Sequence, residues 1–414
     1  MEQDLTVVAR KLADPSNVDH ARQVDMGKLR RYRLARTLEQ LQKRDYGAAL
    51  LYNPINIRYA TGSRNMQVWT MHNAARYAFV PASGKPVLFD YRNSEHLSEG
   101  LETVGEVRRG KNWYWFAVGS NLESRVDAWA DEINDLMRSS CGSNRRLAVD
   151  NLDCEGVSAL LARGISVLNG QEPLEHARAI KSEEEIFCQS YSVAVCETAL
   201  YKLEQAIEPG VTENQLWSIL NAVNTKFGGE YIETKLLSAG GRTNPWYQEC
   251  SNRIVRPGDL VSLDTDMIGP YGYDADISRT FFCEPGEPTG NQKTLYKMAY
   301  DQIHHNMALL RPGLSFREFS ERSWVVPEKF REQAATSTIH GVGMRNEYPM
   351  IGPPEDFQKW GYDGQFEENM TVCVESYIGE KNGTEGVKLE QMVLITQRGI
   401  QLLSTYPFDG RLMP

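Results

Sequence analysis

The sequence predicts a two-domain protein that combines helices and strands, with an α/β domain over residues 1–170 and an α+β domain over residues 171–414. Three observations predict this. The chain has 414 residues, more than one compact core usually takes. Helical and strand-like patterns alternate through the first part, as in α/β domains. In the second part, long helical patterns flank strands that carry carboxylates, which is typical of an α+β domain.

The first domain begins with a polar lead-in over residues 1–25, followed by a helix over Leu29–Arg44 whose apolar residues recur at helical spacing. Short apolar runs bounded by turn residues predict strands, and the Pro-Ala-Ser-Gly segment predicts a hairpin turn. The elements that follow the first helix are a strand at Ala48–Tyr52, hairpin strands at Tyr77–Val80 and Pro86–Phe89, a helix at Leu122–Met137 and a strand at Arg146–Asp150.

The second domain opens with a long helical pattern from Lys181 to Ile207, in which Ser182 precedes three glutamates and is a suitable first capping residue. A Pro-Gly pair ends this helix, and Thr212 begins another that reaches Lys226. A third helix is predicted near Gln292–Leu310, between strand-like segments.

Composition excludes several classes of partner. A net charge of −10 argues against nucleic-acid binding and against a basic membrane-binding surface. No apolar run approaches the roughly 18 residues of a membrane span, and the first residues do not have the pattern of a secretory signal. The seven cysteines show no paired spacing, which favours a reducing cytoplasm over a disulfide framework. We therefore expect a cytoplasmic protein that binds neither nucleic acid nor membranes.

Three aspartates carry the strongest functional signal. Asp264 and Asp266 lie two residues apart in an apolar, strand-like run, so their side chains are expected to share one face. Asp276 follows a Gly-Pro-Tyr-Gly turn, which can bring it opposite them. Three carboxylates on one buried face repel each other unless cations or protons offset their charge. If the Asp-Thr-Asp triplet is considered alone, the alternative to a metal site is that it lies at a solvent-exposed edge of a sheet.

Three residues downstream favour the metal interpretation, because each lies on or beside an apolar strand pattern: His340, Glu375 and Glu390. Oxygen-rich ligation with one imidazole suits Fe, Mn, Zn or Co. A carboxylate that bridges two ions would account for all six ligands, so we predict a dinuclear site made of Asp264, Asp266, Asp276, His340, Glu375 and Glu390.

The order of these ligands and the segment Asp-Ile-Ser-Arg-Thr (276–280) resemble the creatinase, aminopeptidase P, prolidase and methionine aminopeptidase superfamily (M24). The resemblance implies a pita-bread catalytic domain that follows an N-terminal creatinase-like α/β domain in the sequence. It also implies two bound divalent metal ions and a homodimer. Within that superfamily the chain is similar to lyases of dimethylsulfoniopropionate (DMSP). The segments that carry this likeness include the Asp-Thr-Asp triplet and residues 56–61, 65–69, 241–246 and 405–409.

Two histidines that peptidases of the superfamily use are not in the expected places. One normally follows the proline of the segment before the first aspartate, where this chain has Trp246, and the other normally lies about seven residues after His340. A peptidase without them would lose proton shuttles worth roughly 10²–10⁴ in rate each. We therefore favour a metal-dependent carbon–sulfur lyase. The alternative is a C–N hydrolase, either an Xaa-Pro peptidase or a creatinase-like hydrolase of a small osmolyte.

A third alternative is a protein that binds a ligand without catalysing a reaction. In such a protein we would expect some metal ligands to be replaced by other residues, but all six are present. The expected lyase substrate is a small zwitterion with a sulfonium group. An indole face attracts such a cation, so Trp246 and its neighbour Tyr247 are candidates to bind it. Trp113 and Trp115 are further candidates, because in this family the N-terminal domain of a dimer partner can reach the catalytic pocket.

The chain departs from the lyase pattern at two positions. The lyases that it resembles carry an aspartate as base six residues after the metal histidine, where this chain has Asn346, and a tyrosine near the substrate five residues before it, where this chain has Ala335. An amide cannot take up the proton. Glu347, the next residue, is therefore a candidate for the displaced base or for a structural role.

Overall fold

The computed structural model describes residues 24–413, so most of the predicted polar lead-in lies outside the described residues. Contacts divide the chain between Arg178 and Ala179 into an N-terminal unit, which begins at Asp25, and a C-terminal unit. Within residues 24–413, no helix combines the length and apolar character needed to cross a membrane.

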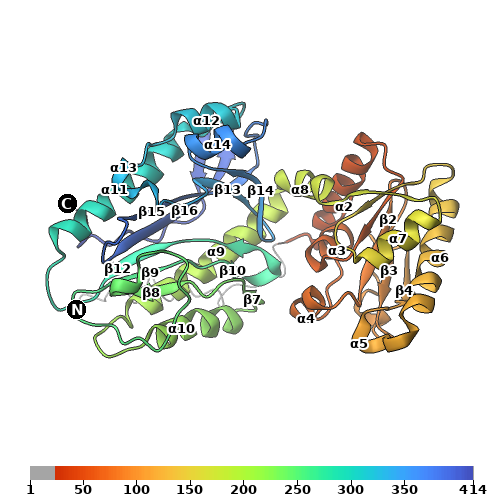
Figure 1. Cartoon of the computed structure of the whole chain (residues 1–414), viewed down its shortest axis with the longest axis horizontal. Coiled ribbons are helices and arrows are strands. Elements are labelled where there is room, and N and C mark those ends of the chain that lie inside the picture. The colour runs from red at the N-terminus through yellow and green to blue at the C-terminus, as the bar shows by residue number, and fades with distance from the viewer. Residues whose placement is uncertain (1–23, 414) are drawn as a thin grey trace. The chain divides into compact units, whose positions relative to one another are not determined.

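The N-terminal unit is built on a six-stranded sheet with the order β4-β3-β2-β1-β5-β6 (Figure 1). The predicted hairpin is confirmed, because β2 and β3 pair antiparallel. The parallel β1–β5 pair joins the first and last predicted strands of this domain. The strands are β1 (Ala48–Leu51), β2 (Tyr77–Pro81), β3 (Val87–Asp90), β4 (Glu106–Arg109), β5 (Arg146–Val149) and β6 (Ser166–Asn169).

Helices cover both faces of this sheet because its strand residues alternate between two apolar clusters. Leu50 and Phe79 face the cluster that contains Trp129 of α6. Ala49 and Val80 face the cluster that contains Leu41 of α2. The helices are α2 (Met26–Lys43), α3 (Pro54–Thr61), α4 (Gln67–His72), α5 (Trp115–Val118), α6 (Leu122–Cys141), α7 (Cys154–Ala162) and α8 (Gln171–Ala179).

The C-terminal unit contains three antiparallel sheets, with the orders β11-β10-β7, β12-β9-β8 and β14-β13-β15-β16-β17. Its strands are β7 (Tyr231–Ile232), β8 (Leu237–Ala239), β9 (Leu260–Leu263), β10 (Met267–Ile268), β11 (Asp274–Ala275), β12 (Arg279–Phe282), β13 (Ile339–Val342), β14 (Asn346–Ile351), β15 (Thr371–Gly379), β16 (Gly386–Thr396) and β17 (Gly399–Leu402).

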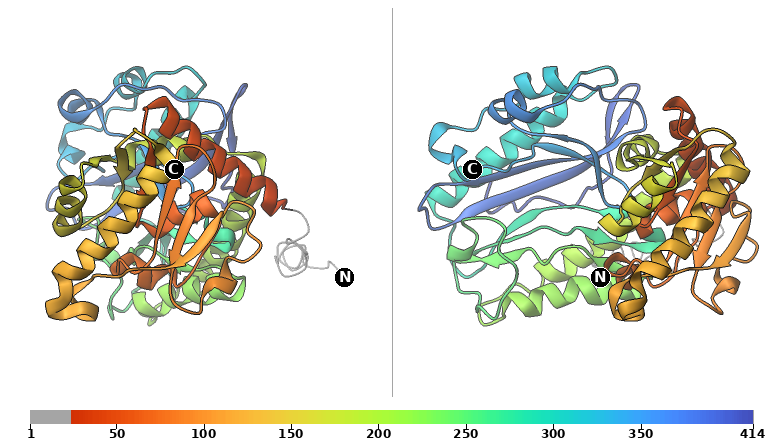
Figure 2. Two further views of the ribbon diagram at one scale, coloured as in Figure 1. Left: turned by 90° about the vertical axis from the view of Figure 1, so that its right-hand side faces the viewer. Right: turned by 45° about the vertical axis from the view of Figure 1, so that its right-hand side comes forward.

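Helices enclose these sheets from two sides, each with its own apolar cluster (Figure 2, right). The predicted start of the first helix is confirmed, because Ser182 and Glu185 form a capping box at the first turn of α9. The helices are α9 (Glu183–Glu204) and α10 (Glu213–Lys226) on one side, and α11 (Gly290–Leu309), α12 (Phe316–Arg322), α13 (Glu328–Arg331) and α14 (Pro354–Trp360) in the other half of the unit.

The site described below lies where the sheets of the C-terminal unit meet. Strand β16 contacts both β9 and β12, and the backbone N–H of Glu390 donates to the carbonyl of Ser278 at 3.1 Å. Segments more than a hundred residues apart in the sequence are thereby fixed side by side in the interior.

Candidate metal centre

The six predicted metal ligands come from two groups of segments. Asp264 and Asp266 follow β9, and Asp276 follows β11. His340 lies on β13, while Glu375 on β15 and Glu390 on β16 are directly opposite each other in the strand register. Side chains of opposed residues in neighbouring antiparallel strands are close together, so the register itself brings the two glutamates together.

One expectation about the aspartates is wrong. Asp264 and Asp266 do not share a face of one continuous strand, because residues 264–266 form the connection between β9 and β10. Asp266 has a left-handed backbone conformation with φ of 34°, which is unusual for a residue other than glycine. The turn, rather than strand alternation, brings the two carboxylates together.

The imidazole of His340 lies among the carboxylates. Its Nε2 atom is 3.3 Å from Oε1 of Glu390, 3.7 Å from Oδ2 of Asp276 and 3.9 Å from Oε1 of Glu375. On the other side of the ring, Nδ1 lies 3.1 Å from the carbonyl oxygen of Gly341. A bond from Nδ1–H to that carbonyl would leave Nε2 free to bind a metal, as is usual for ligating histidines.

Two groups of potential ligands overlap at Asp276. One consists of Asp276, His340, Cys373 and Glu390, and the other of Asp264, Asp266 and Asp276; within each group the ligand atoms lie within 4.8 Å of one another. In addition, the buried Oε1 of Glu390 has no hydrogen-bond partner among residues 24–413. A buried carboxylate oxygen without a donor is costly unless a cation faces it. The residues therefore fit divalent cations of the kind that oxygen ligands and one imidazole hold.

The electrostatics of the site agree with this fit. Burial, followed by the charge of Asp264, raises the pKa of Asp266 to about 7. Burial and the neighbouring Asp266 raise the pKa of Asp276 well above its usual value. For His340, burial works to lower the pKa, but the carboxylates of Glu390 and Glu375 beside its ring raise it to about 9. Without a metal, the site gathers protons in place of cations.

Cys373 belongs to the cluster, although the sequence analysis named only carboxylates and one imidazole as ligands. It lies opposite His340 in the strand register and two residues before Glu375, on the same face of β15. Burial and the charge of Glu390 raise the pKa of its thiol well above the usual value, so the thiol is protonated near neutral pH. Counting in steps of two from Glu375 along the strand would have found it.

Trp246 is linked to β15, the strand that carries Glu375, through a second residue that the sequence analysis missed, Tyr377. The two rings are 5.7 Å apart, and Tyr377 follows Glu375 by two residues on β15, about 7 Å along the same face. The hydroxyl of Tyr377 donates to the carbonyl of Thr243 at 2.8 Å, which fixes the segment before Trp246. Ala335 lines a small cavity with Tyr377. Tyr247, by contrast, is 66% exposed.

Asn346 and Glu347 point to different partners. The side-chain amide of Asn346 donates to Oδ1 of Asp266 at 3.3 Å. The carboxylate of Glu347 is buried, where it accepts from Lys181 at 3.1 Å and from the backbone N–H of Met344 at 3.0 Å. Glu347 thus ties the turn between β13 and β14 to the segment that begins α9.

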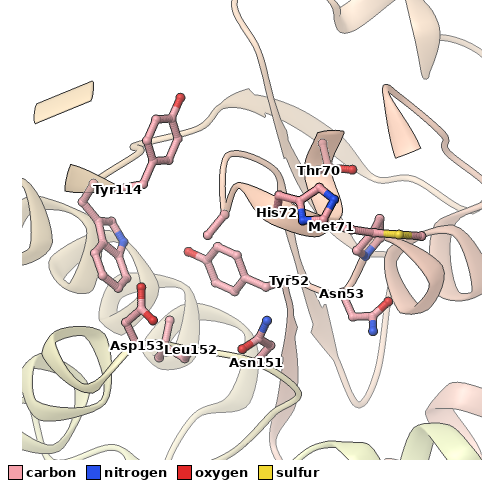
Figure 3. A pocket seen from close by; sticks show the side chains of 12 residues that line it. Tyr52, Asn53, Thr70, Met71, His72, Tyr114, Asn151, Leu152 and Asp153 are labelled. Carbon is pink, nitrogen blue, oxygen red and sulfur yellow. The ribbon is translucent and has the colours of Figure 1, made fainter. Parts of the chain in front are cut away.

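The two tryptophans predicted in the N-terminal unit have different surroundings. Trp113 is buried against Trp129 of α6, with ring centroids 5.3 Å apart. It also lines a cavity of about 250 Å³ with Tyr52, Tyr114 and Asp153 (Figure 3). Trp115 is 66% exposed at the start of α5.

Comparison with known proteins gives consistent results for the two units. Residues 189–397 match the model of metallopeptidase family M24, and residues 33–180 match that of the creatinase/prolidase N-terminal domain. The chain is 40% identical over 394 residues to dimethylsulfoniopropionate lyase DddP of Roseovarius nubinhibens, covering 94% of this chain and 88% of that protein. It is 38% identical, with the same coverage, to DddP of Roseobacter denitrificans.

Solved structures show the same fold at lower sequence identity. An Xaa-Pro dipeptidase from Bacillus anthracis superposes with a TM-score of 0.73 at 20% identity, over 91% of this chain and 98% of that one. A prolidase from Pyrococcus horikoshii gives a TM-score of 0.73 at 19% identity, over 91% and 99%. The predicted fold class, a pita-bread catalytic domain with an N-terminal creatinase-like α/β domain, is confirmed. The chain belongs to metallopeptidase family M24 and carries the creatinase/prolidase type of N-terminal domain.

Proposed function

We propose that this protein is a metal-dependent lyase that cleaves DMSP, or a closely related small onium zwitterion, to acrylate and dimethyl sulfide. The observation that carries the proposal is the 40% identity to DddP over 94% of the chain. The cluster of carboxylates around His340 supports it, as does the indole at position 246, where M24 peptidases would be expected to carry a histidine.

The reaction is a β-elimination. The proton next to the substrate carboxylate leaves, a carbon–carbon double bond forms, and the β carbon–sulfur bond breaks to release dimethyl sulfide. Two divalent ions, held by the six predicted ligands, would act as Lewis acids toward the substrate carboxylate. This would make the proton on the adjacent carbon more acidic.

The residues around the ions would orient the substrate. Trp246 offers an indole face for the sulfonium cation, and Tyr377, two residues after Glu375 on β15, packs against that indole. Asn346 donates to Asp266 and thereby fixes the orientation of its carboxylate. Glu347 is engaged by Lys181, so we assign it to holding the turn that carries Asn346.

A homodimer is part of the proposal. In that arrangement the N-terminal unit of the partner subunit would add aromatic groups to the pocket, and the exposed Trp115 and the cavity lined by Trp113 are the candidates. Light scattering of the purified protein measures the mass, and a monomer would contradict this part of the proposal.

The test is headspace detection of dimethyl sulfide from purified, metal-analysed protein given DMSP, with an Xaa-Pro dipeptide as the second substrate. The variants Asn346→Asp and Glu347→Gln identify the proton acceptor. Asn382→Asp adds the same charge as the first variant in the exposed turn after β15 and serves as its control.

We expect gas from the wild-type protein, no dipeptide hydrolysis, and no effect of Asn382→Asp. A large loss of rate in Glu347→Gln, with metal content and thermal midpoint unchanged, would assign proton removal to Glu347 in place of the structural role. If Asn346→Asp, but not Asn382→Asp, releases dimethyl sulfide faster than the wild type, the residue at position 346 limits the rate. Dipeptide hydrolysis without gas would overturn the lyase proposal in favour of the hydrolase alternative.

A further inference from the structure

Lys388 lies at the centre of the carboxylate cluster, although it is not one of the predicted ligands. It precedes Glu390 by two residues on β16, so both side chains lie on the same face of the strand. Its ammonium nitrogen is 2.7 Å from Oε2 of Glu375, 3.2 Å from Oε2 of Glu390 and 3.3 Å from Oδ2 of Asp264. The side chain is only 2% exposed, and a lysine is rarely buried unless it is paired.

The carboxylates use different oxygens for Lys388 and for His340. Glu375 and Glu390 direct Oε2 toward the ammonium and Oε1 toward the imidazole of His340. The hydroxyl of Ser278 lies on the Lys388 side as well, at 2.8 Å from Oδ1 of Asp264 and 2.6 Å from Oε2 of Glu390. A hydroxyl has one proton to donate, whereas an ammonium has three. Lys388 is therefore able to donate to all three carboxylates at once.

The sum of the charges in the cluster indicates what Lys388 contributes. Five of the predicted ligands are carboxylates, and the sixth, His340, binds metal as a neutral imidazole. Two divalent cations would offset four of the five negative charges. The ammonium of Lys388 offsets the remaining one, so the charges of the six ligands, the two ions and Lys388 sum to zero. A buried net charge would be costly.

We infer that Lys388 is a positioning residue that supplies the fifth positive charge of the centre. It holds one oxygen each of Asp264, Glu375 and Glu390, while Oε1 of Glu375 and Oε1 of Glu390 face His340 and remain available to the ions. The inference rests on the proposed dinuclear centre and adds a fixed protein cation to it. The competing arrangement is one in which the ammonium occupies the place of an ion, so that each chain binds one.

The test compares wild-type protein with Lys388→Met, Lys388→Gln and Lys388→Arg. Each protein is prepared metal-free and then loaded with Mn²⁺, and its metal content and thermal midpoint are measured in both forms. Lys181→Met is the matched control, because it also removes a buried lysine from an ion pair in the same unit, with Glu347 rather than with a predicted metal ligand.

We expect two Mn²⁺ per wild-type chain. Lys388→Met and Lys388→Gln should lower the midpoint of the metal-free form by roughly 6–10 °C more than that of the Mn²⁺-loaded form. The reason is that the variant leaves five carboxylates without any fixed cation when the ions are absent, but only one negative charge without a counterion when two ions are bound. Lys388→Arg should restore most of the difference, and Lys181→Met should lower both midpoints equally.

Equal losses in the two forms of Lys388→Met would make Lys388 an ordinary structural lysine and overturn the inference. One Mn²⁺ in the wild type with two in Lys388→Met would also overturn it, because the ammonium would then occupy an ion's place. If the midpoints behave as expected but DMSP releases no gas, the inference stands and the proposed lyase reaction fails.

Discussion

Each unit of this protein contains a buried cluster of charges, and the two clusters are built in opposite ways. In the N-terminal unit, Arg76 and Asp90 form an ion pair of 2.7 Å with side-chain exposures of 0% and 1%. Asp90 also accepts from the amide of Asn65 at 3.0 Å and from the backbone N–H of Tyr91 at 2.8 Å. One cation faces one anion, and Asp90 has donors for both oxygens, so folding alone explains the pair.

The C-terminal unit instead gathers carboxylates in excess. Five acidic side chains surround His340 and Lys388, and within the described part of the chain Oε1 of Glu390 has no hydrogen-bond partner. Such an excess would be costly if the folded chain were all that occupied the site. A buried pair of opposite charges is therefore explained by the fold, whereas a buried excess of one charge indicates a ligand of the opposite charge.

The largest expected effect comes from removing one charge of the surplus. Glu390→Gln should lose bound metal and lower the rate of dimethyl sulfide release by roughly a thousandfold or more, because Lewis-acid stabilisation contributes several kcal/mol. Elemental analysis and headspace detection measure the two effects. Glu385→Gln is the control, since Glu385 accepts from Gln292 and from the backbone N–H of Leu260 instead. Two ions retained in Glu390→Gln would contradict the metal assignment.

Breaking the balanced pair should cost stability without changing the metal content. Arg76→Met leaves Asp90 buried without its cation, and we expect a loss of about 3–5 kcal/mol in the free energy of unfolding. Urea denaturation measures the loss. Replacing both partners with apolar residues should cost less than the single change, because no charge is left unpaired. A double variant that is less stable than Arg76→Met would show that the pair contributes more than charge balance.

The last effect, which is the smallest when measured over a single pH unit, is a pH dependence that only the surplus should show. In the metal-free protein the pKa of Asp266 is raised from 3.8 to about 7, chiefly by burial. The folded form then holds a proton that the unfolded form releases. The free energy of unfolding should therefore fall as pH rises from about 4 to 7, by at most about 1.4 kcal/mol per pH unit for this group.

His340 adds a loss of the same sign at higher pH. Its pKa is raised from 6.5 to about 9 in the folded protein, so its contribution is complete below pH 6.5 and disappears as pH rises through 9. Thermal midpoints of chelated and Mn²⁺-loaded protein across pH 5–9 test both contributions. The loaded form should lack the decline, because cations take the place of the protons. Equal slopes in the two forms would contradict the idea that metal and protons compete for the site.

The sequence by itself determined the features that depend on neighbouring residues. Helix α9 begins at Ser182 because its hydroxyl and the side chain of Glu185 cap the first turn, and both residues lie in the same four-residue segment. The hairpin of β2 and β3 depends on the short turn between them. The six predicted ligands could also be named, because acidic residues inside apolar strand patterns have no local explanation.

Only the tertiary structure decided how those ligands are arranged and what else lies among them. The left-handed turn at Asp266, the thiol of Cys373 and the ring of Tyr377 beside Trp246 follow from how separate sheets and loops meet. The pairing of Glu347 with Lys181 joins residues 166 positions apart, and the contact of Lys388 with Asp264 also joins distant segments. Local sequence patterns specify which face of a strand is buried, but a buried charge finds its partner through packing between distant segments.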